Sequence, residues 1–246
     1  MGRAFEFRKA RKNKRWSKIS KAFTRIGKEI YISVKKSGPD PINNSRLRSV
    51  IQNAKSVNMP KENIERAIKK ASEQNSESYK ELLYEGYGPG GVAILIECMT
   101  DNRNRTVAEV RHALTKHGGN LGTEGSVAYL FEQIGYISIN NSDDPDSLME
   151  LAIESGAEDI EINDDGSIEI ETDPQNLIDV KESLGDGGID VDINQLIMKA
   201  STEVSVERKH AESMMKLLDT LDDLDDVQKV HSNIEFSDEI LSSIDD

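Results

Sequence analysis

Cysteine, aromatic side chains and long apolar runs are all scarce in this chain of 246 residues. Cys98 is the single cysteine, which excludes an intramolecular disulfide and a cysteine metal site and fits a reducing compartment. No apolar run reaches the roughly 18 residues that a membrane-spanning helix needs. The N-terminus has no apolar core segment, so we expect no secretory signal peptide. These absences favour a cytoplasmic protein with no membrane partner.

Recognisable catalytic motifs are also missing. The closest pair of histidines, His112 and His117, are five positions apart, whereas two metal ligands on one helix face need a spacing of four. Neither a G-x-S-x-G motif nor a Walker-type loop occurs. Gly86, Gly88 and Gly91 formally match G-x-G-x-x-G, but a strand is expected to follow, so a β-hairpin connection is the better interpretation. We expect no enzyme, metal, cofactor or small-molecule substrate.

Charge is distributed unevenly, which the net charge of −14 conceals. Residues 1–75 hold 20 Lys and Arg against 6 Asp and Glu, whereas the remaining residues hold 11 against 39. This asymmetry predicts a basic binding module attached to acidic domains.

The segment 11–36 carries two stripes at helical period. The apolar stripe, expected to pack in a core, is Trp16, Ile19, Phe23, Ile26 and Ile30. The cationic stripe, about 200° of rotation away, is Arg11, Lys14, Lys18, Lys21, Arg25 and Lys28. A solvated helix face is the simplest alternative, but such faces usually mix both signs of charge. Acidic residues are almost absent here, so a polyanion-binding role is favoured.

Two more amphipathic helices are predicted, from Leu47 to Val57 and after Pro60, which complete a three-helix bundle over residues 1–75. Its Lys and Arg would neutralise phosphates, and they suit phosphate contact better than base recognition because no helix-turn-helix arrangement is evident. The candidate nucleic-acid-binding residues are Arg8, Lys9, Arg11, Lys14, Arg15, Lys18, Lys21, Arg25, Lys28, Arg46, Arg48, Lys61, Arg66, Lys69 and Lys70, with Arg103 and Arg105 on a later helix.

The rest of the chain predicts two α/β-sandwich (ferredoxin-like) domains. Strands LLYE and VAILIECMT precede a helix over 101–117, with Thr106 and Glu109 as a capping box, and SVAYLFEQ is a further strand. Residues 134–200, beginning with strand GYISI, follow the order βαββαβ. The unit over 82–133 lacks one helix and one strand to complete its sheet. A helix over 206–221 and the strand VQKVHSNIEF are expected to supply them. The predicted fold is therefore α+β, with domains 1–75, 76–133 plus 206–246, and an inserted acidic domain 134–205.

Two long motifs carry a resemblance, RLRSVIQNAKSVNMPKENIERAIKKA and YEGYGPGGVAILIECMTDNRNRTVAEVRHALTKHGGNLGTEGSVAYLF. With the basic start they closely resemble the YebC/PmpR family, which includes the mitochondrial translational activator of cytochrome oxidase. The resemblance covers essentially the whole chain. It implies a cytoplasmic regulatory protein of three domains, the third inserted in the second. The start MGRAFEFRKARKNKRW departs from the GHSKW-like segment of many members and suggests a subgroup.

Members of that family are described as DNA-binding transcriptional regulators or as ribosome-associated factors that aid translation, including through proline-rich stretches. The first expectation is a regulator of gene expression that binds DNA through the basic helical module. A ribosome- or rRNA-binding translation factor and a protein-interaction adaptor stay open as alternatives, as does the oligomeric state. The Arg-rich start is also typical of a mitochondrial presequence, although cleavage would remove part of a helix expected to pack in a core.

Overall fold

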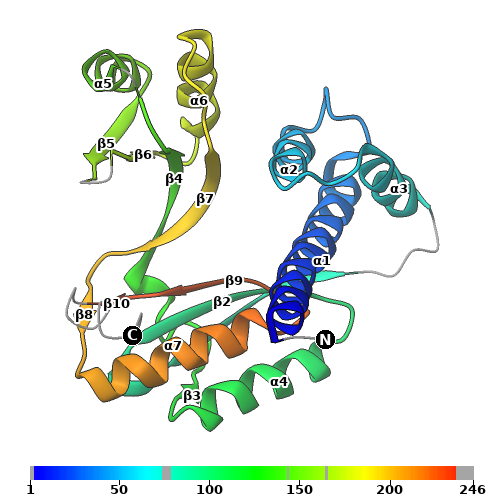
Figure 1. Cartoon of the computed structure of the whole chain (residues 1–246), viewed down its shortest axis with the longest axis vertical. Coiled ribbons are helices and arrows are strands. Elements are labelled where there is room, and N and C mark those ends of the chain that lie inside the picture. The colour runs from blue at the N-terminus through cyan, green and yellow to red at the C-terminus, as the bar shows by residue number, and fades with distance from the viewer. Residues whose placement is uncertain (1–2, 74–78, 143, 164–165, 237–246) are drawn as a thin grey trace. The chain divides into compact units, whose positions relative to one another are not determined.

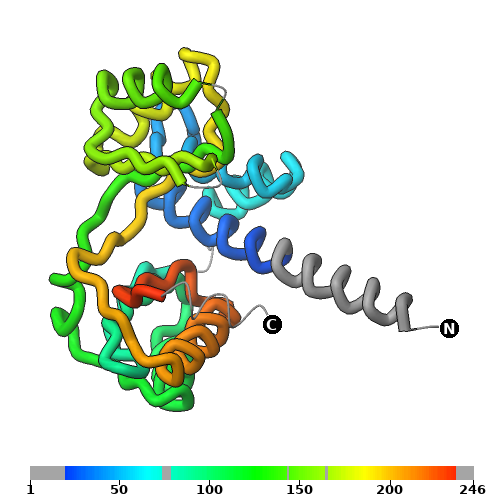
Figure 2. Tube along the Cα trace, turned by 60° about the vertical axis from the view of Figure 1, so that its left-hand side comes forward, coloured from blue at the N-terminus to red at the C-terminus, as the bar shows by residue number. Residues whose placement is uncertain are grey.

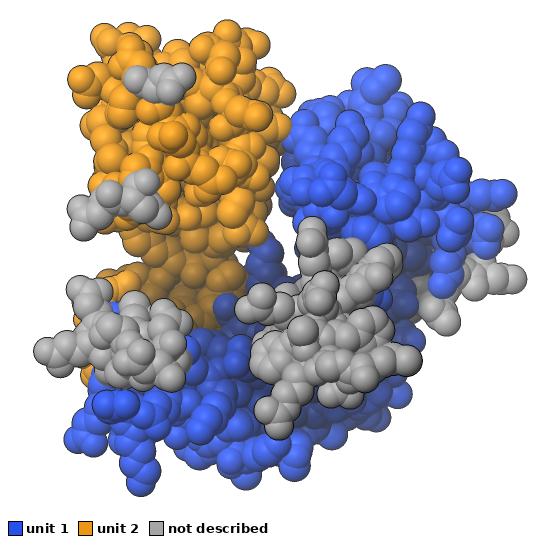
Figure 3. Space-filling view, in the orientation of Figure 1, with its two compact units in different colours: residues 1–126, 206–230, 236–246 blue, residues 127–205, 231–235 orange. Residues whose placement is uncertain are grey.

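The computed structural model describes residues 3–73, 79–142, 144–163 and 166–236, with side chains from Ser20 onward (Figure 1). The chain forms two compact units (Figure 3). Unit 1 comprises residues 1–126, 206–230 and 236–246, and unit 2 comprises residues 127–205 and 231–235. Both contain antiparallel sheet and helices, so the α+β class is confirmed. The division into three domains stays a prediction.

Unit 1 begins with three helices, α1 (Arg3–Ser37), α2 (Ser45–Ser56) and α3 (Lys61–Ser72), as the sequence predicts. Asn44 joins the first two, because its side chain caps α2 at Leu47 N and donates to the carbonyls of Ser33 and Gly38. The shared apolar core includes Ile26, Ile30, Leu47, Val50, Ala54, Ile64 and Ala71. The part of the apolar stripe on α1 that the structure describes therefore faces the other two helices.

The sheet of unit 1 has the order β3-β1-β2-β9. Its strands are β1 (Lys80–Tyr87), β2 (Ala93–Thr100), β3 (Asn120–Leu121) and β9 (Val227–Ser232). Figures 1 and 2 both show β9 beside β2, although they lie far apart in the sequence. The helices α4 (Arg103–Lys116) and α7 (Arg208–Asp222) contact each other, and His117 Nε2 lies 3.0 Å from Thr220 Oγ1.

The glycine-rich segment between β1 and β2 is a hairpin connection, which confirms the sequence interpretation. The strands are antiparallel with Tyr87 opposite Ala93, and the 3-10 turn η1 (Pro89–Gly91) joins them. Gly90 and Gly91 have φ of 75° and 81°, a left-handed conformation that favours glycine. No helix follows directly, so the segment does not form a nucleotide-binding loop of the dinucleotide type.

Unit 2 has the predicted succession β4 (Phe131–Ile139), α5 (Pro145–Glu154), β5 (Ala157–Ile162), β6 (Ile168–Thr172), α6 (Leu177–Asp186) and β7 (Ile193–Ala200). These strands form a sheet of order β5-β6-β4-β7. Ile137, Ile139, Ile168 and Ile170 alternate along two of the strands and share one core with apolar residues of both helices. The short strands β8 (Val204–Ser205) and β10 (Ile234–Glu235) pair in parallel.

Three local predictions are wrong. The segment VQKVHSNIEF, predicted as one strand, is divided between β9 and β10, which belong to different sheets. Residues 126–139 were expected to hold two strands, but β4 is continuous from Phe131 to Ile139 and pairs with β6 and β7. Gly135 marks a close approach and not a break, because a Cβ there would lie 2.2 Å from Thr172 Oγ1. Asn102, not Thr106, caps α4, since its side chain accepts from Arg105 N.

Candidate nucleic-acid interface

The six most N-terminal candidates lie outside the residues whose side chains the structure describes. They are Arg8, Lys9, Arg11, Lys14, Arg15 and Lys18, and their positions fall within the bounds of α1. The described part of the cationic stripe therefore consists of Lys21, Arg25 and Lys28. All three meet an acidic segment that connects α7 to β9, which we define as Asp222–Asp226.

Lys21 and Arg25 form partly exposed ion pairs with this acidic segment. Lys21 Nζ pairs with the carboxylate of Asp223. Arg25 Nη2 lies 2.9 Å from Asp222 Oδ1 and donates to the Asp222 carbonyl at 2.7 Å. The carboxylate side chains are 75% exposed in Asp223 and 64% exposed in Asp222. Exposed pairs of this kind contribute little to stability because water and salt screen them.

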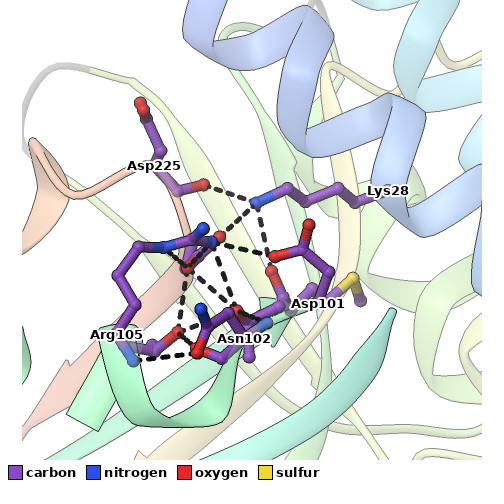
Figure 4. A network of polar contacts seen from close by, with 9 residues as sticks. Lys28, Asp101, Asn102, Arg105 and Asp225 are labelled. Atoms are coloured by element: carbon purple, nitrogen blue, oxygen red, sulfur yellow. Dashed lines mark hydrogen bonds and ion pairs between the residues drawn. The ribbon is translucent and has the colours of Figure 1, made fainter. Parts of the chain in front are cut away.

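Lys28 has a different environment, since it is buried. Its Nζ donates to Asp226 Oδ1 at 2.8 Å, to the Asp225 carbonyl at 2.8 Å and to the Met99 carbonyl at 3.1 Å (Figure 4). An ammonium has three N–H donors, and all three have protein acceptors here. Lys28 therefore belongs to a structural network, and its ammonium has no N–H donor left for a phosphate.

Asp226 is the centre of that network. Its Oδ2 accepts from the hydroxyls of Thr100 at 2.9 Å and Thr106 at 2.8 Å. It also accepts from Arg105 Nη2 at 2.6 Å. Burial alone would raise the pKa of Asp226, but the hydrogen bonds from Lys28, Arg105 and the two threonines outweigh it and hold the pKa at about 2. The carboxylate is therefore ionised across the physiological range.

Arg105 is committed to this network as well, although it was a candidate for phosphate contact. Besides Asp226, its Nη2 lies 3.0 Å from Asp101 Oδ1. Arg105 and Lys28 line a cleft of about 540 Å³ together with several carboxylates. The other residues around the cleft are Thr24, Tyr79, Asp101, Glu109, Asp223, Leu224, Asp225 and Asp226. Its excess of acidic side chains does not suit a phosphate ligand.

Two candidate cations of α2, Arg46 and Arg48, differ in their partners, and Arg46 shares its partner with Lys36 of α1. Arg46 and Lys36 both pair with Glu81, and although burial opposes the shift, these two contacts lower the pKa of that carboxyl group. Arg48 donates to the carbonyls of Pro41 and Ile42, both at 3.2 Å. Arg46 thus fastens α2 to β1, whereas the exposed Arg48 supports the turn before its own helix.

The cations of α3 are more available. Lys61 lies 3.7 Å from Glu65 Oε1, and its side chain is 88% exposed. Arg66 and Lys69 are exposed, lie three positions apart and therefore neighbour each other on the helix, and form no ion pair with any residue that the structure describes. Lys70 and, on α4, Arg103 are exposed too. Arg66 and Lys69 are the best-placed described residues for phosphate contact.

The acidic segment is the feature that sequence reasoning missed. Its signal is the run LDDLDDV at 221–227, which in an acidic chain looks like an ordinary solvated turn. Its carboxylates meet helix α1 only because the fold brings residues about 200 positions apart together.

Among the described residues, no group of His, Cys, Asp or Glu is arranged to hold a metal ion. Within the same residues, no helix is long and apolar enough to span a membrane.

Comparison with known proteins gives matches over nearly the whole chain. A family described as TACO1/YebC protein N-terminal domain matches residues 3–74, and one described as TACO1/YebC second and third domain matches residues 79–234. A probable transcriptional regulatory protein of Nitrosococcus oceani is 48% identical over 235 residues, covering 95% of each chain. One of Francisella tularensis is 48% identical over 237 residues, covering 96% of each. The crystal structure of a conserved hypothetical protein from Aquifex aeolicus has a TM-score of 0.83 and 46% identity, and the match covers 90% of this chain and 92% of that one.

Proposed function

This chain belongs to the TACO1/YebC family, and from that membership and its segregated charge we propose that it is a nucleic-acid-binding regulator of gene expression. The observation that carries the proposal is the basic helical module, whose residues 1–75 hold 20 Lys and Arg against 6 Asp and Glu. Each phosphate that such cations neutralise releases counterions, which drives binding. The regulatory names of the relatives favour DNA as the target.

The proposed contact surface is drawn from the candidate cations of the sequence, and it leaves out three whose ion pairs hold distant parts of the fold together. Arg66 and Lys69 represent it among the described residues. The remaining members are Arg8, Lys9, Arg11, Lys14, Arg15, Lys18, Arg48, Lys61 and Lys70, with Arg103 on α4. Lys21 and Arg25 join it when phosphates displace their partners Asp223 and Asp222. Lys28, Arg46 and Arg105 are assigned to structural ion pairs.

The acidic remainder of the molecule has a role in this proposal. It holds 11 Lys and Arg against 39 Asp and Glu, so it repels a phosphate backbone. Contact is therefore concentrated on the basic module, with Arg103 as the one proposed member outside it, and non-specific coating of nucleic acid is disfavoured. We infer that selectivity comes from the shape of the target as much as from its sequence, because Lys and Arg side chains suit phosphate contact.

RNA is the second candidate target, since phosphate contact does not by itself distinguish a DNA duplex from structured RNA. The same cations would then contact rRNA, and the protein would act as a ribosome-associated translation factor. A third possibility is an adaptor whose acidic units carry the activity and whose basic module only docks. The three differ in what the protein binds most tightly and in whether the basic module is needed for activity.

The test compares labelled DNA and RNA duplexes of the same sequence by fluorescence anisotropy, with ribosome co-sedimentation at moderate salt. The variant is Arg66→Glu with Lys69→Glu, and the matched control is Lys209→Glu with Lys216→Glu, the same charge change on exposed residues of α7. The proposal predicts weaker binding for the first variant alone. Promoter binding that persists against competitor DNA supports a transcriptional regulator, and salt-resistant pelleting with ribosomes supports a translation factor. If the Arg66→Glu, Lys69→Glu variant still regulates gene expression as the wild type does, the adaptor is supported.

A further inference from the structure

We infer that the acidic segment Asp222–Asp226 is an internal competitor for nucleic acid, which neutralises part of the cationic stripe of α1 until phosphates displace it. This inference rests on the proposed function, because the displacing ligand is the phosphate backbone of the bound nucleic acid. It concerns the regulation of that same surface. The acidic segment would lower the affinity for any polyanion that needs Lys21 and Arg25.

The geometry that supports this is a matched row of charges. Lys21, Arg25 and Lys28 follow one another at steps of four and three, so they lie on one face of α1. Each pairs with a different carboxylate of the acidic segment, namely Asp223, Asp222 and Asp226. A row of anions along a row of helical cations is also what a nucleic-acid strand would present to this face.

Burial divides the three contacts into an anchor and an exchangeable part. The Lys28 and Asp226 side chains are 8% and 4% exposed, so separating them would leave buried charges without a partner. In the other two pairs the carboxylates are mostly exposed, and water and ions reach them. Phosphates can therefore replace Asp222 and Asp223 while the inner pair keeps α1 attached to the acidic segment.

A simpler explanation is that the outer pairs only help to fasten α1. The two explanations make opposite statements about affinity. An anion tethered in the same chain competes at a high effective concentration, so removing it must tighten the binding of an external anion. A contact that only fastens the helix would leave that affinity unchanged, or would reduce it if the helix lost its position.

The experiment measures the affinity of the full chain for a labelled DNA duplex and an RNA duplex of the same sequence. The test variant is Asp222→Asn with Asp223→Asn. The control is Glu207→Gln with Asp219→Asn, which changes the net charge equally at positions outside the acidic segment whose carboxylates form no ion pair within the described part of the chain. We expect about threefold to tenfold tighter binding for the test variant, because two exposed ion pairs are lost. We expect a change of less than about twofold for the control.

A second variant shows where any gain arises. Adding Lys21→Gln and Arg25→Gln to the test variant removes the cations that the acidic segment covers, so the gain should disappear. Thermal unfolding of each variant checks that the fold is retained. If the test variant binds no more tightly than the control, the inference that the acidic segment competes with nucleic acid is wrong. Absence of binding by every variant, wild type included, overturns the proposed function itself and the competitor with it.

Discussion

Lys28 Nζ lies 2.8 Å from Asp226 Oδ1, a contact between residues 198 positions apart in the sequence. Both side chains are buried, and Asp226 also accepts hydrogen bonds from Thr100, Thr106 and Arg105. The contact joins helix α1 to the segment between α7 and β9. It therefore connects the basic N-terminal module to the C-terminal part of unit 1 through one buried charge pair.

Removal of one partner of this pair should be strongly destabilising. We expect Asp226→Asn to lower the free energy of unfolding by about 3 to 5 kcal/mol, since the buried Lys28 ammonium would lose its counter-charge. Adding Lys28→Met should recover part of this loss. Asp223→Asn, which breaks an exposed pair, serves as the control and should cost about 1 kcal/mol or less. Urea unfolding gives the free energy of unfolding of the wild type and the three variants. A small effect of Asp226→Asn would contradict the structural role of the buried pair.

The same carboxylate should make stability depend on pH in the acid range. The pKa of Asp226 falls from its ordinary 3.8 to about 2 in the folded chain, so its contribution is complete above pH 3.8 and is lost as the pH falls toward 2. The contribution that is lost is about 2 kcal/mol. The difference in unfolding free energy between wild type and Asp226→Asn should shrink over that window. A constant difference would show that protonation of another group governs acid unfolding.

Cys98 should be chemically inert in the folded protein. It is 1% exposed, and burial together with the charge of Asp226 raises the pKa of its thiol to about 12. The reactive form of cysteine is the thiolate, which is then scarce and inaccessible. We expect no labelling by a thiol reagent at mildly alkaline pH and complete labelling in concentrated guanidinium chloride. Rapid labelling of the native protein would indicate local opening of β2.

The exposed cations of α3 should determine part of the salt dependence of nucleic-acid binding. Each phosphate neutralised contributes about 0.9 to the slope of log affinity against log salt. Replacing Arg66 and Lys69 by Gln should therefore reduce the magnitude of that slope by about 2, with Lys209→Gln and Lys216→Gln as the matched control. Titrations at several salt concentrations give the slopes. Equal slopes for both variants would exclude Arg66 and Lys69 from the contact surface.

Most helices and strands could be predicted from the sequence because the signals that mark them are local. The stripes of α2 and α3 and the alternation in unit 2 follow from helical and strand periodicity. The continuity of β4 could not be predicted in this way, because Gly135 looks like a break until Thr172 is seen to pack against it. The cap of α4 was misplaced because the helix begins at Arg103, which puts Thr106 inside the helix, where its hydroxyl donates to the Asn102 carbonyl and to Asp226.

By itself the sequence determined where charge is concentrated and which stripe of the first helix is apolar, since both follow from residue order and the helical period. It could not rank the cations of that helix. Lys21 and Lys28 occupy equivalent places in the stripe, yet one pair is partly exposed and the other buried. Only the tertiary structure decided this, because the strength of an ion pair depends on the burial and partners that distant segments supply.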